Sequence, residues 1–194
     1  EDWLEDGTLV VEKRPAIYVI QEKFQHEGKR FTRQSIIARV RLEDFSNGVV
    51  LPHEETSQGP KKDRFGVISA TNANLSPLMG IYREDQGSIA NLILNTVKAP
   101  PDASAFYESE TINLWSLRDS QWTKIITQSL KEKKIYLADG HHRYETSLNY
   151  MNAHNQKAKM SPDDPKNFVM MSLIEINDPG LIVLPYHRIL RNLS

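Results

Sequence analysis

The chain has 194 residues, of which 39% are hydrophobic and 25% are charged, and its formal net charge is −1. These values suit one globular domain, and the mixing of positive and negative side chains argues against a surface that binds nucleic acid. The absence of cysteine excludes disulfides, thiolate nucleophiles and thiolate-bound zinc. No apolar run approaches the length of a membrane span and no signal-peptide pattern is present, so we expect a cytoplasmic protein without a membrane partner.

The first part of the chain has the pattern of an antiparallel hairpin. Extended segments are expected at 9–11 and 15–20, a turn at 26–29, and a partly alternating strand within 30–42. Residues 44–48 form the next predicted turn. A helix is then expected from Lys61 to about Asn74, and Ser76-Pro77 ends it.

The rest of the chain alternates predicted strands and helices. Strands are expected at 78–82, 111–117, 135–138, 167–176 and 181–184, and helices at 87–93, 120–130 and from 141 onwards. Residues 99–104 have the composition of a linker, and 153–166 that of a polar loop. This order predicts a mixed α/β (α+β) fold in a single domain, 1–194, that is excised from a longer chain.

The predicted elements centre on the junction between a strand and a helix at residues 135–148. The apolar run 135–138 is typical of a buried strand, and Asp139-Gly140 is a turn. Tyr144, Leu148 and Met151 have the spacing of one helix face. The first turn of this helix therefore carries His141, His142 and Arg143.

This junction has the features of a phosphate site. A helix start offers free backbone N–H groups and the positive end of the dipole, and Gly140 lets an anion approach the backbone. His142 or Arg143 can add donors, whereas His141 and His142 point about 100° apart and cannot both face one ligand equally. The alternative is a plain junction with Asp139 as the helix cap. The capping box is incomplete, because His142 stands where Glu or Gln is required.

Common catalytic frameworks are missing. The sequence has neither the P-loop nor the dinucleotide-binding glycine pattern. His53-Glu54 begins like a zinc-protease helix, but Ser57 stands where the second His is required. The charges at 61–64 are typical of a solvated helix start.

Residues 139–145, Asp-Gly-His-His-Arg-Tyr-Glu, resemble boxes of the ParB/sulfiredoxin superfamily. The similarity is to the Gly-Cys-His-Arg-Tyr box of sulfiredoxin, the Gly-Glu-Arg-Arg box of ParB-type partition proteins and, most of all, the Asp-Gly-His-x-Arg box of free-serine kinases. His141 occupies the place of the sulfiredoxin cysteine, so that chemistry is excluded. The chain also resembles a bacterial domain family of unknown function, through segments 52–56, 62–64, 74–77, 138–143 and 184–188.

The resemblance implies a ParB/sulfiredoxin-like core whose strand-turn-helix corner holds nucleotide phosphates. It implies a phosphotransferase that uses ATP or ADP with Mg²⁺ and acts on a small hydroxyl compound, serine being the leading acceptor. We expect catalytic roles for Glu54, Asp139, His141 and Arg143, with Glu54 and Asp139 as metal ligands. The expected phosphate-binding residues are Gly140, His141, His142, Arg143, Lys62, Arg64 and Arg188, and the further candidates are His53, Thr56, Asp63 and His187.

Two other functions stay open at this point. One is a nucleotide-binding regulatory module of the ParB type, without phosphotransfer and without DNA binding. The other is a metal-dependent hydrolase that uses His53, His141, His142, His187, Glu54 and Asp139 as ligands. The oligomeric state is also open, and a homodimer is one of the expected arrangements.

Overall fold

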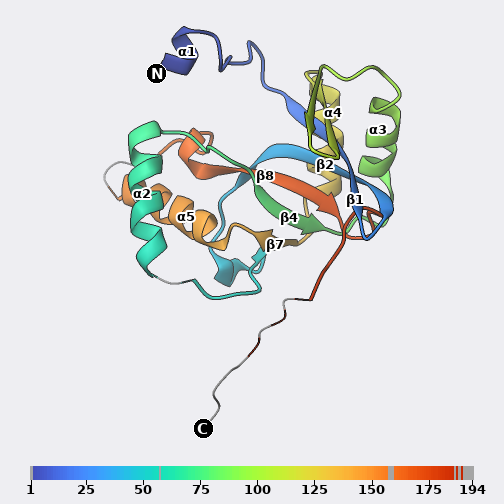
Figure 1. Ribbon diagram of the computed structural model, residues 1–194. Coiled ribbons are helices and arrows are strands. Elements are labelled where there is room, and N and C mark those ends of the chain that lie inside the picture. The colour runs from blue at the N-terminus through green and yellow to red at the C-terminus, as the bar shows by residue number, and fades with distance from the viewer. Residues whose placement is uncertain (1, 57, 157–159, 186, 188, 190–194) are drawn as a thin grey trace.

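A computed structural model describes residues 2–56, 58–156, 160–185, 187 and 189 (Figure 1). The helices are α1 (Asp2–Glu5), α2 (Gln58–Thr71), α3 (Ser88–Thr96), α4 (Ser120–Leu130) and α5 (His141–Asn155), with short 3₁₀ turns at 45–47 and 165–167. The strands are β1 (Ile17–His26), β2 (Lys29–Arg41), β3 (Val50–Leu51), β4 (Leu78–Tyr82), β5 (Ala103–Tyr107), β6 (Glu110–Leu117), β7 (Ile135–Asp139) and β8 (Phe168–Glu175). The predicted mixed α/β class is confirmed.

All eight strands belong to one mixed sheet, in the order β3-β7-β4-β8-β2-β1-β6-β5. β3 is parallel to β7 and β4 is parallel to β8, whereas the other neighbours are antiparallel. The predicted hairpin is β1 and β2, joined by a turn at residues 27 and 28. Within the described part of the chain no helix is long and apolar enough to span a membrane.

The core lies on one face of this sheet. In the strand registers Gly80 lies between Leu137 and Leu173, and these buried residues share a face with Ile36 and Trp115. Apolar side chains of α3, α4 and α5 join the same hydrophobic cluster. The sheet and these three helices therefore form two layers around one core.

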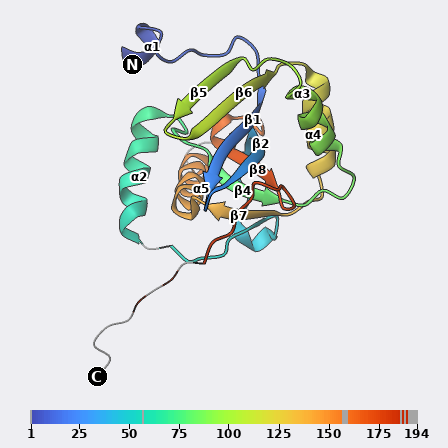
Figure 2. The same cartoon turned by 45° about the vertical axis from the view of Figure 1, so that its right-hand side comes forward.

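The helices form two pairs. α3 and α4 lie together at one end of the sheet, and α2 lies beside α5 at the other (Figures 1 and 2). None of the described side chains of α2 belongs to the buried cluster, and α2 contacts α5 instead, where the ring of Phe65 lies 6.0 Å from the ring of Tyr150. α2 is thus an outer layer that rests on another helix.

Five predictions about local structure are wrong. The segment 181–184 is not a strand, and Val183 is 84% exposed because no neighbouring strand pairs with it. Residues 103 and 104 belong to β5 rather than to a linker, and 9–11 lie outside the strands. α2 begins at Gln58, three residues before the predicted start, since a proline is tolerated in the first helical turn. α5 continues to Asn155, into the segment predicted as a loop.

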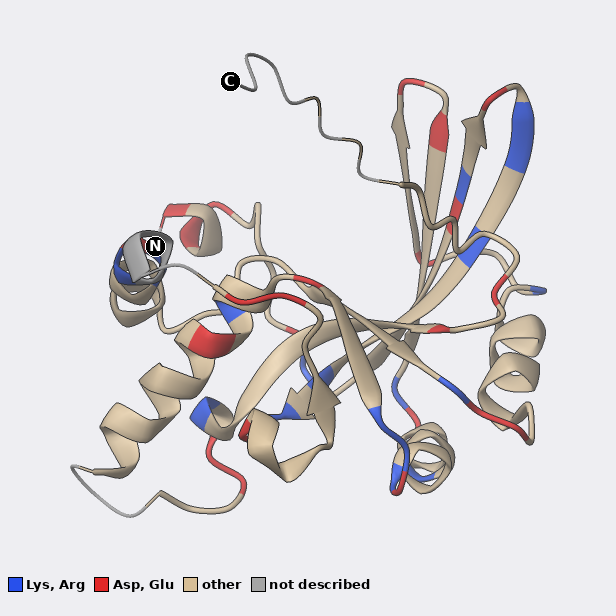
Figure 3. Ribbon diagram, turned by 90° about the horizontal axis from the view of Figure 1, so that it is seen from below, with Lys and Arg blue, Asp and Glu red and all other residues tan. Residues whose placement is uncertain are grey.

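Charged residues are spread over the elements. Figure 3 shows Lys and Arg interspersed with Asp and Glu rather than gathered on one helix or strand. This distribution agrees with the net charge of −1.

Candidate functional site

Three loops that are distant in the sequence meet at one edge of the sheet. Because β3 is parallel to β7, the residues that follow both strands lie at the same edge. Because β4 is antiparallel to β7, with Met79 beside Asp139, the residues that precede β4 lie there too. We call the segments 52–56, 74–77 and 138–143 the candidate site.

His141 is the buried centre of the candidate site, with only 2% of its surface exposed. Its Nδ1 lies 3.0 Å from Glu54 Oε1, and its Nε2 accepts a hydrogen bond of 3.3 Å from the backbone N–H of His53. Since a backbone N–H can only donate, Nε2 carries no proton, and Nδ1–H must donate to the carboxylate of Glu54. The surroundings therefore select the neutral Nδ1–H tautomer of His141.

The electrostatics of His141 agree with this assignment. Burial lowers the pKa of His141 below its ordinary value, and the neighbouring His53 lowers it further, against the opposing effect of Glu54. Glu54 itself remains 53% exposed. The result is a carboxylate that is held by a neutral histidine on one side and is open to solvent on the other.

His53 links the loop after β3 to the end of β7. Its Nε2 lies 3.2 Å from the carbonyl oxygen of Ala138, so Nε2 carries the proton and donates. Its ring meets the ring of His141 edge-on, with centroids 4.4 Å apart and planes 81° apart. These contacts fix the backbone on which Glu54 is carried.

At the corner between β7 and α5, Asp139 does not cap the helix, in contrast to the alternative considered from the sequence. The N-cap residue is Gly140, with φ of 94°, and no side chain caps the helix. Asp139 is 71% exposed, and its Oδ2 pairs with Arg143 Nη2 at 2.7 Å. The first turn of α5 therefore begins without a cap from the side chain of its N-cap residue.

Arg143 is bound by the protein itself. Besides the pair with Asp139, its Nη1 donates to the hydroxyl and carbonyl oxygens of Ser76, at 2.6 and 3.3 Å, and to the carbonyl of Pro77 at 2.8 Å. The guanidinium lies over Gly140, where an added Cβ would come within 3.0 Å of Nη2. Arg143 thus ties the loop before β4 to the corner, rather than extending freely towards solvent.

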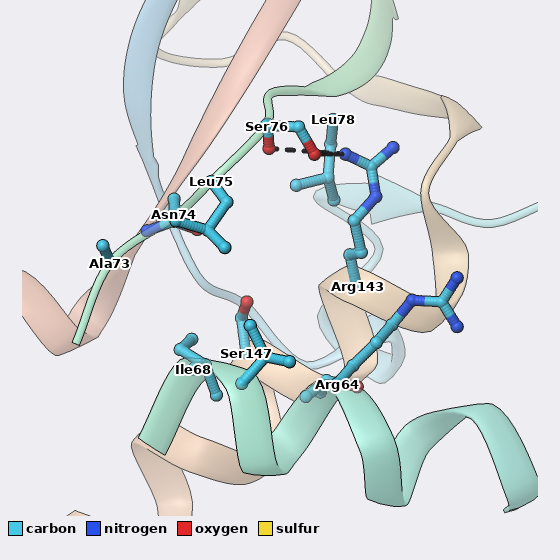
Figure 4. A pocket seen from close by; sticks show the side chains of 11 residues that line it. Arg64, Ile68, Ala73, Asn74, Leu75, Ser76, Leu78, Arg143 and Ser147 are labelled. Carbon is cyan, nitrogen blue, oxygen red and sulfur yellow. Dashed lines mark hydrogen bonds between the residues drawn. The ribbon is translucent and has the colours of Figure 1, made fainter. Parts of the chain in front are cut away.

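A cavity of about 130 Å³ lies beside Arg143, between α2 and α5 (Figure 4). Arg64 of α2 and Arg143 both line it, and Figure 4 shows their side chains on the same side of the cavity. Among the described residues Arg64 has no ion-pair or hydrogen-bond partner. Two arginines, one bound and one free of partners, are therefore brought together here.

The other predicted residues lie in different surroundings. Lys62 and Asp63 are exposed on α2, and the buried hydroxyl of Thr56 has no hydrogen-bond partner within the described residues. His142 is half-buried, and its carbonyl accepts a hydrogen bond from Thr146. His187 is exposed, and Arg188 lies outside the described residues.

The histidines do not assemble into a metal centre in the described part of the chain. No group of three or more His, Asp or Glu side chains is arranged there to hold a metal ion. Both ring nitrogens of His141 are engaged by protein groups, and His53 Nε2 faces a carbonyl. This arrangement gives no support to the hydrolase hypothesis.

Two polar groups of the site were not among the candidates from sequence. Ser76 anchors Arg143, and Ser147 lines the cavity from α5. The segment Asn74-Leu75-Ser76-Pro77 had a signal, as one of the segments that carry the family resemblance. Ser147 had none, because a small polar residue within a helix has no distinctive pattern.

Comparison with known proteins assigns the chain to a family. Neither the curated proteins nor the solved structures gave a significant match. A family model matches the whole chain, residues 1–194. The chain therefore belongs to the family described as "Protein of unknown function (DUF1015)".

Proposed function

We propose that the protein is a nucleotide- and Mg²⁺-dependent phosphotransferase that acts on a small hydroxyl compound. The observation that carries this proposal is Glu54, a half-exposed carboxylate held 3.0 Å from the buried His141 at the start of α5. The resemblance of residues 139–143 to the Asp-Gly-His-x-Arg box of free-serine kinases supports the same reaction and makes serine the leading acceptor.

Glu54 has the surroundings of a general base. His141 donates to one of its oxygens and is itself fixed by the backbone of His53, so the second oxygen is positioned by a rigid chain of hydrogen bonds. In the transfer, the acceptor oxygen bonds to the terminal phosphorus of ATP, the bond to the bridging oxygen breaks, and ADP leaves. The hydroxyl proton passes to Glu54.

Asp139 and Glu54 are the residues that fit Mg²⁺. This ion takes oxygen ligands, and one or two carboxylates commonly hold it together with substrate phosphates. Asp139 is 71% exposed and Glu54 is 53% exposed, so both offer oxygens to solvent at the same sheet edge. The ion would neutralise phosphate charge. Without it, the two carboxylates would repel the phosphates.

The start of α5 suits the phosphates. Gly140 leaves the first turn without a side-chain cap, and the positive end of the helix dipole favours an anion. Arg143 is held by Asp139, Ser76 and Pro77, so its contribution is to shape this corner.

The test is incubation with ATP or ADP, Mg²⁺ and serine or another small alcohol, followed by mass spectrometry of the phosphorylated product. We expect Glu54→Gln to lower turnover by about 10²- to 10⁴-fold, because the amide cannot accept the proton. Glu55→Gln is the matched control, since Glu55 is an exposed neighbour in the same loop.

Two outcomes would contradict the proposal. If the Glu54→Gln variant were as active as the wild type, Glu54 would not be the general base. If no hydroxyl acceptor gave a phosphorylated product, the protein would not be a phosphotransferase of this kind. Tight nucleotide binding without acceptor-dependent turnover would instead indicate a regulatory module of the ParB type.

A further inference from the structure

The cavity beside Arg143 has a lining of unusual chemistry. Its floor is apolar, and its polar groups are two arginines, an amide and three hydroxyls. The lining residues are Arg64, Val67, Ile68, Ala73, Asn74, Leu75, Ser76, Leu78, Arg143, Thr146 and Ser147. None of these described residues is acidic, so the cavity favours an anionic ligand.

The position of the cavity connects it with the candidate site. Arg143 lines the cavity and also pairs with Asp139, and Ser76 takes part in both. Its volume of about 130 Å³ is below the range of about 300–1,000 Å³ that is usual for drug-sized ligands. A molecule much smaller than a nucleotide therefore fits it better.

Two polar side chains in the lining have no hydrogen-bond partner among the described residues. Ser147 is only 6% exposed, and its hydroxyl makes no hydrogen bond with any described residue. Ser147 lines the cavity, so its hydroxyl can donate to a ligand oxygen. Arg64 has no described partner either, whereas the guanidinium of Arg143 is already engaged.

We infer that this cavity binds the acceptor of the reaction through a carboxylate, which pairs with Arg64, and that it does not recognise an amino group. An ammonium group would need a carboxylate to balance its charge, and none of the described lining residues is acidic. The ligand class is a small hydroxy carboxylate. Only its role as acceptor rests on the proposed phosphotransfer.

Three compounds of similar size separate the recognised groups. Glycerate has a carboxylate and no amine, serine has both, and ethanolamine has an amine and no carboxylate. Calorimetric titration without nucleotide should show that glycerate and serine bind with similar affinity and that ethanolamine does not. Because this measures binding alone, it decides the inference even if the protein transfers no phosphate.

The matched variants are Arg64→Gln and Arg83→Gln. Arg64→Gln should weaken glycerate binding by about tenfold or more, the usual cost of losing a charged hydrogen bond. Arg83 is 71% exposed, pairs with Asp85 and lies at the other end of β4, so its replacement should leave binding unchanged.

Several results would overturn the inference. These are binding of ethanolamine as tight as that of glycerate, binding of serine without binding of glycerate, no binding of any of the three, and unchanged glycerate binding in Arg64→Gln. If ethanolamine alone were phosphorylated, the carboxylate inference would fail while the phosphotransferase proposal would stand. If glycerate bound and nothing were phosphorylated, the reverse would hold.

Discussion

At the scale of single residues, His141 positions Glu54 and also affects how the stability of the fold depends on pH. The lowered pKa of His141 follows first from burial and then from His53, and the ordinary value is 6.5. Between these two pKa values the unfolded chain binds a proton that the folded chain does not. Stability rises with pH wherever the unfolded state binds more protons. The free energy of unfolding therefore falls as the pH drops below 6.5, the ordinary pKa of histidine.

This predicts the behaviour of His141→Asn, whose amide can still donate to Glu54 but does not titrate. Urea unfolding should show a smaller loss of stability between about pH 7.5 and about pH 5.5 in the variant than in the wild type. His26→Asn is the control, since His26 lies in β1, away from the candidate site. Identical pH dependence in wild type and His141→Asn would show that His141 is not held in the neutral form.

At the scale of elements, the corner between β7 and α5 depends on one glycine. Gly140 and Gly48 both have positive φ, of 94° and 66°, where an L side chain is strained. An added Cβ at Gly140 would lie 3.0 Å from both Arg143 Nη2 and Leu78 Cγ, whereas at Gly48 nothing lies within 4 Å. The two positions therefore share the conformational cost but differ in the contacts with Arg143 and Leu78.

We predict that Gly140→Ala destabilises the fold more than Gly48→Ala. The backbone conformation should cost about 1–2 kcal/mol at either position, and displacement of Arg143 and Leu78 should add about 1 kcal/mol or more at Gly140. Urea denaturation of both variants measures the difference. Equal costs would mean that Arg143 moves aside freely and does not hold this corner.

The helices and strands were largely predictable from the sequence, but the contacts between distant segments at the candidate site were not. The run 135–138 with Gly140 and the helical spacing after it predicted β7 and α5, and β4 has the predicted bounds. β5 was missed because it is a wholly exposed edge strand without an apolar pattern, next to two prolines. The contact between His53 and His141 spans 88 positions and depends on the parallel pairing of β3 with β7, which no local pattern encodes.

At the scale of the whole molecule, α2 packs mainly against α5. The buried cluster includes residues of the sheet and of α3, α4 and α5, while the ring contact of α2 is Phe65 on Tyr150, outside that cluster. Phe45 makes the comparable contact inside it, stacked on Tyr144 at 5.1 Å and packed against the core. Local opening of α2 should therefore occur without global unfolding.

A matched pair of Phe→Ala variants tests this division. Phe65→Ala should speed hydrogen exchange of the amides in α2 and change the free energy of unfolding little, whereas Phe45→Ala should lower that free energy by about 2 kcal/mol or more. Because α2 carries Arg64, loosening it should also weaken binding in the cavity between α2 and α5. A large global destabilisation by Phe65→Ala would instead show that α2 is part of the cooperative core, and the cavity would then be a rigid feature of the fold rather than one whose outer wall opens.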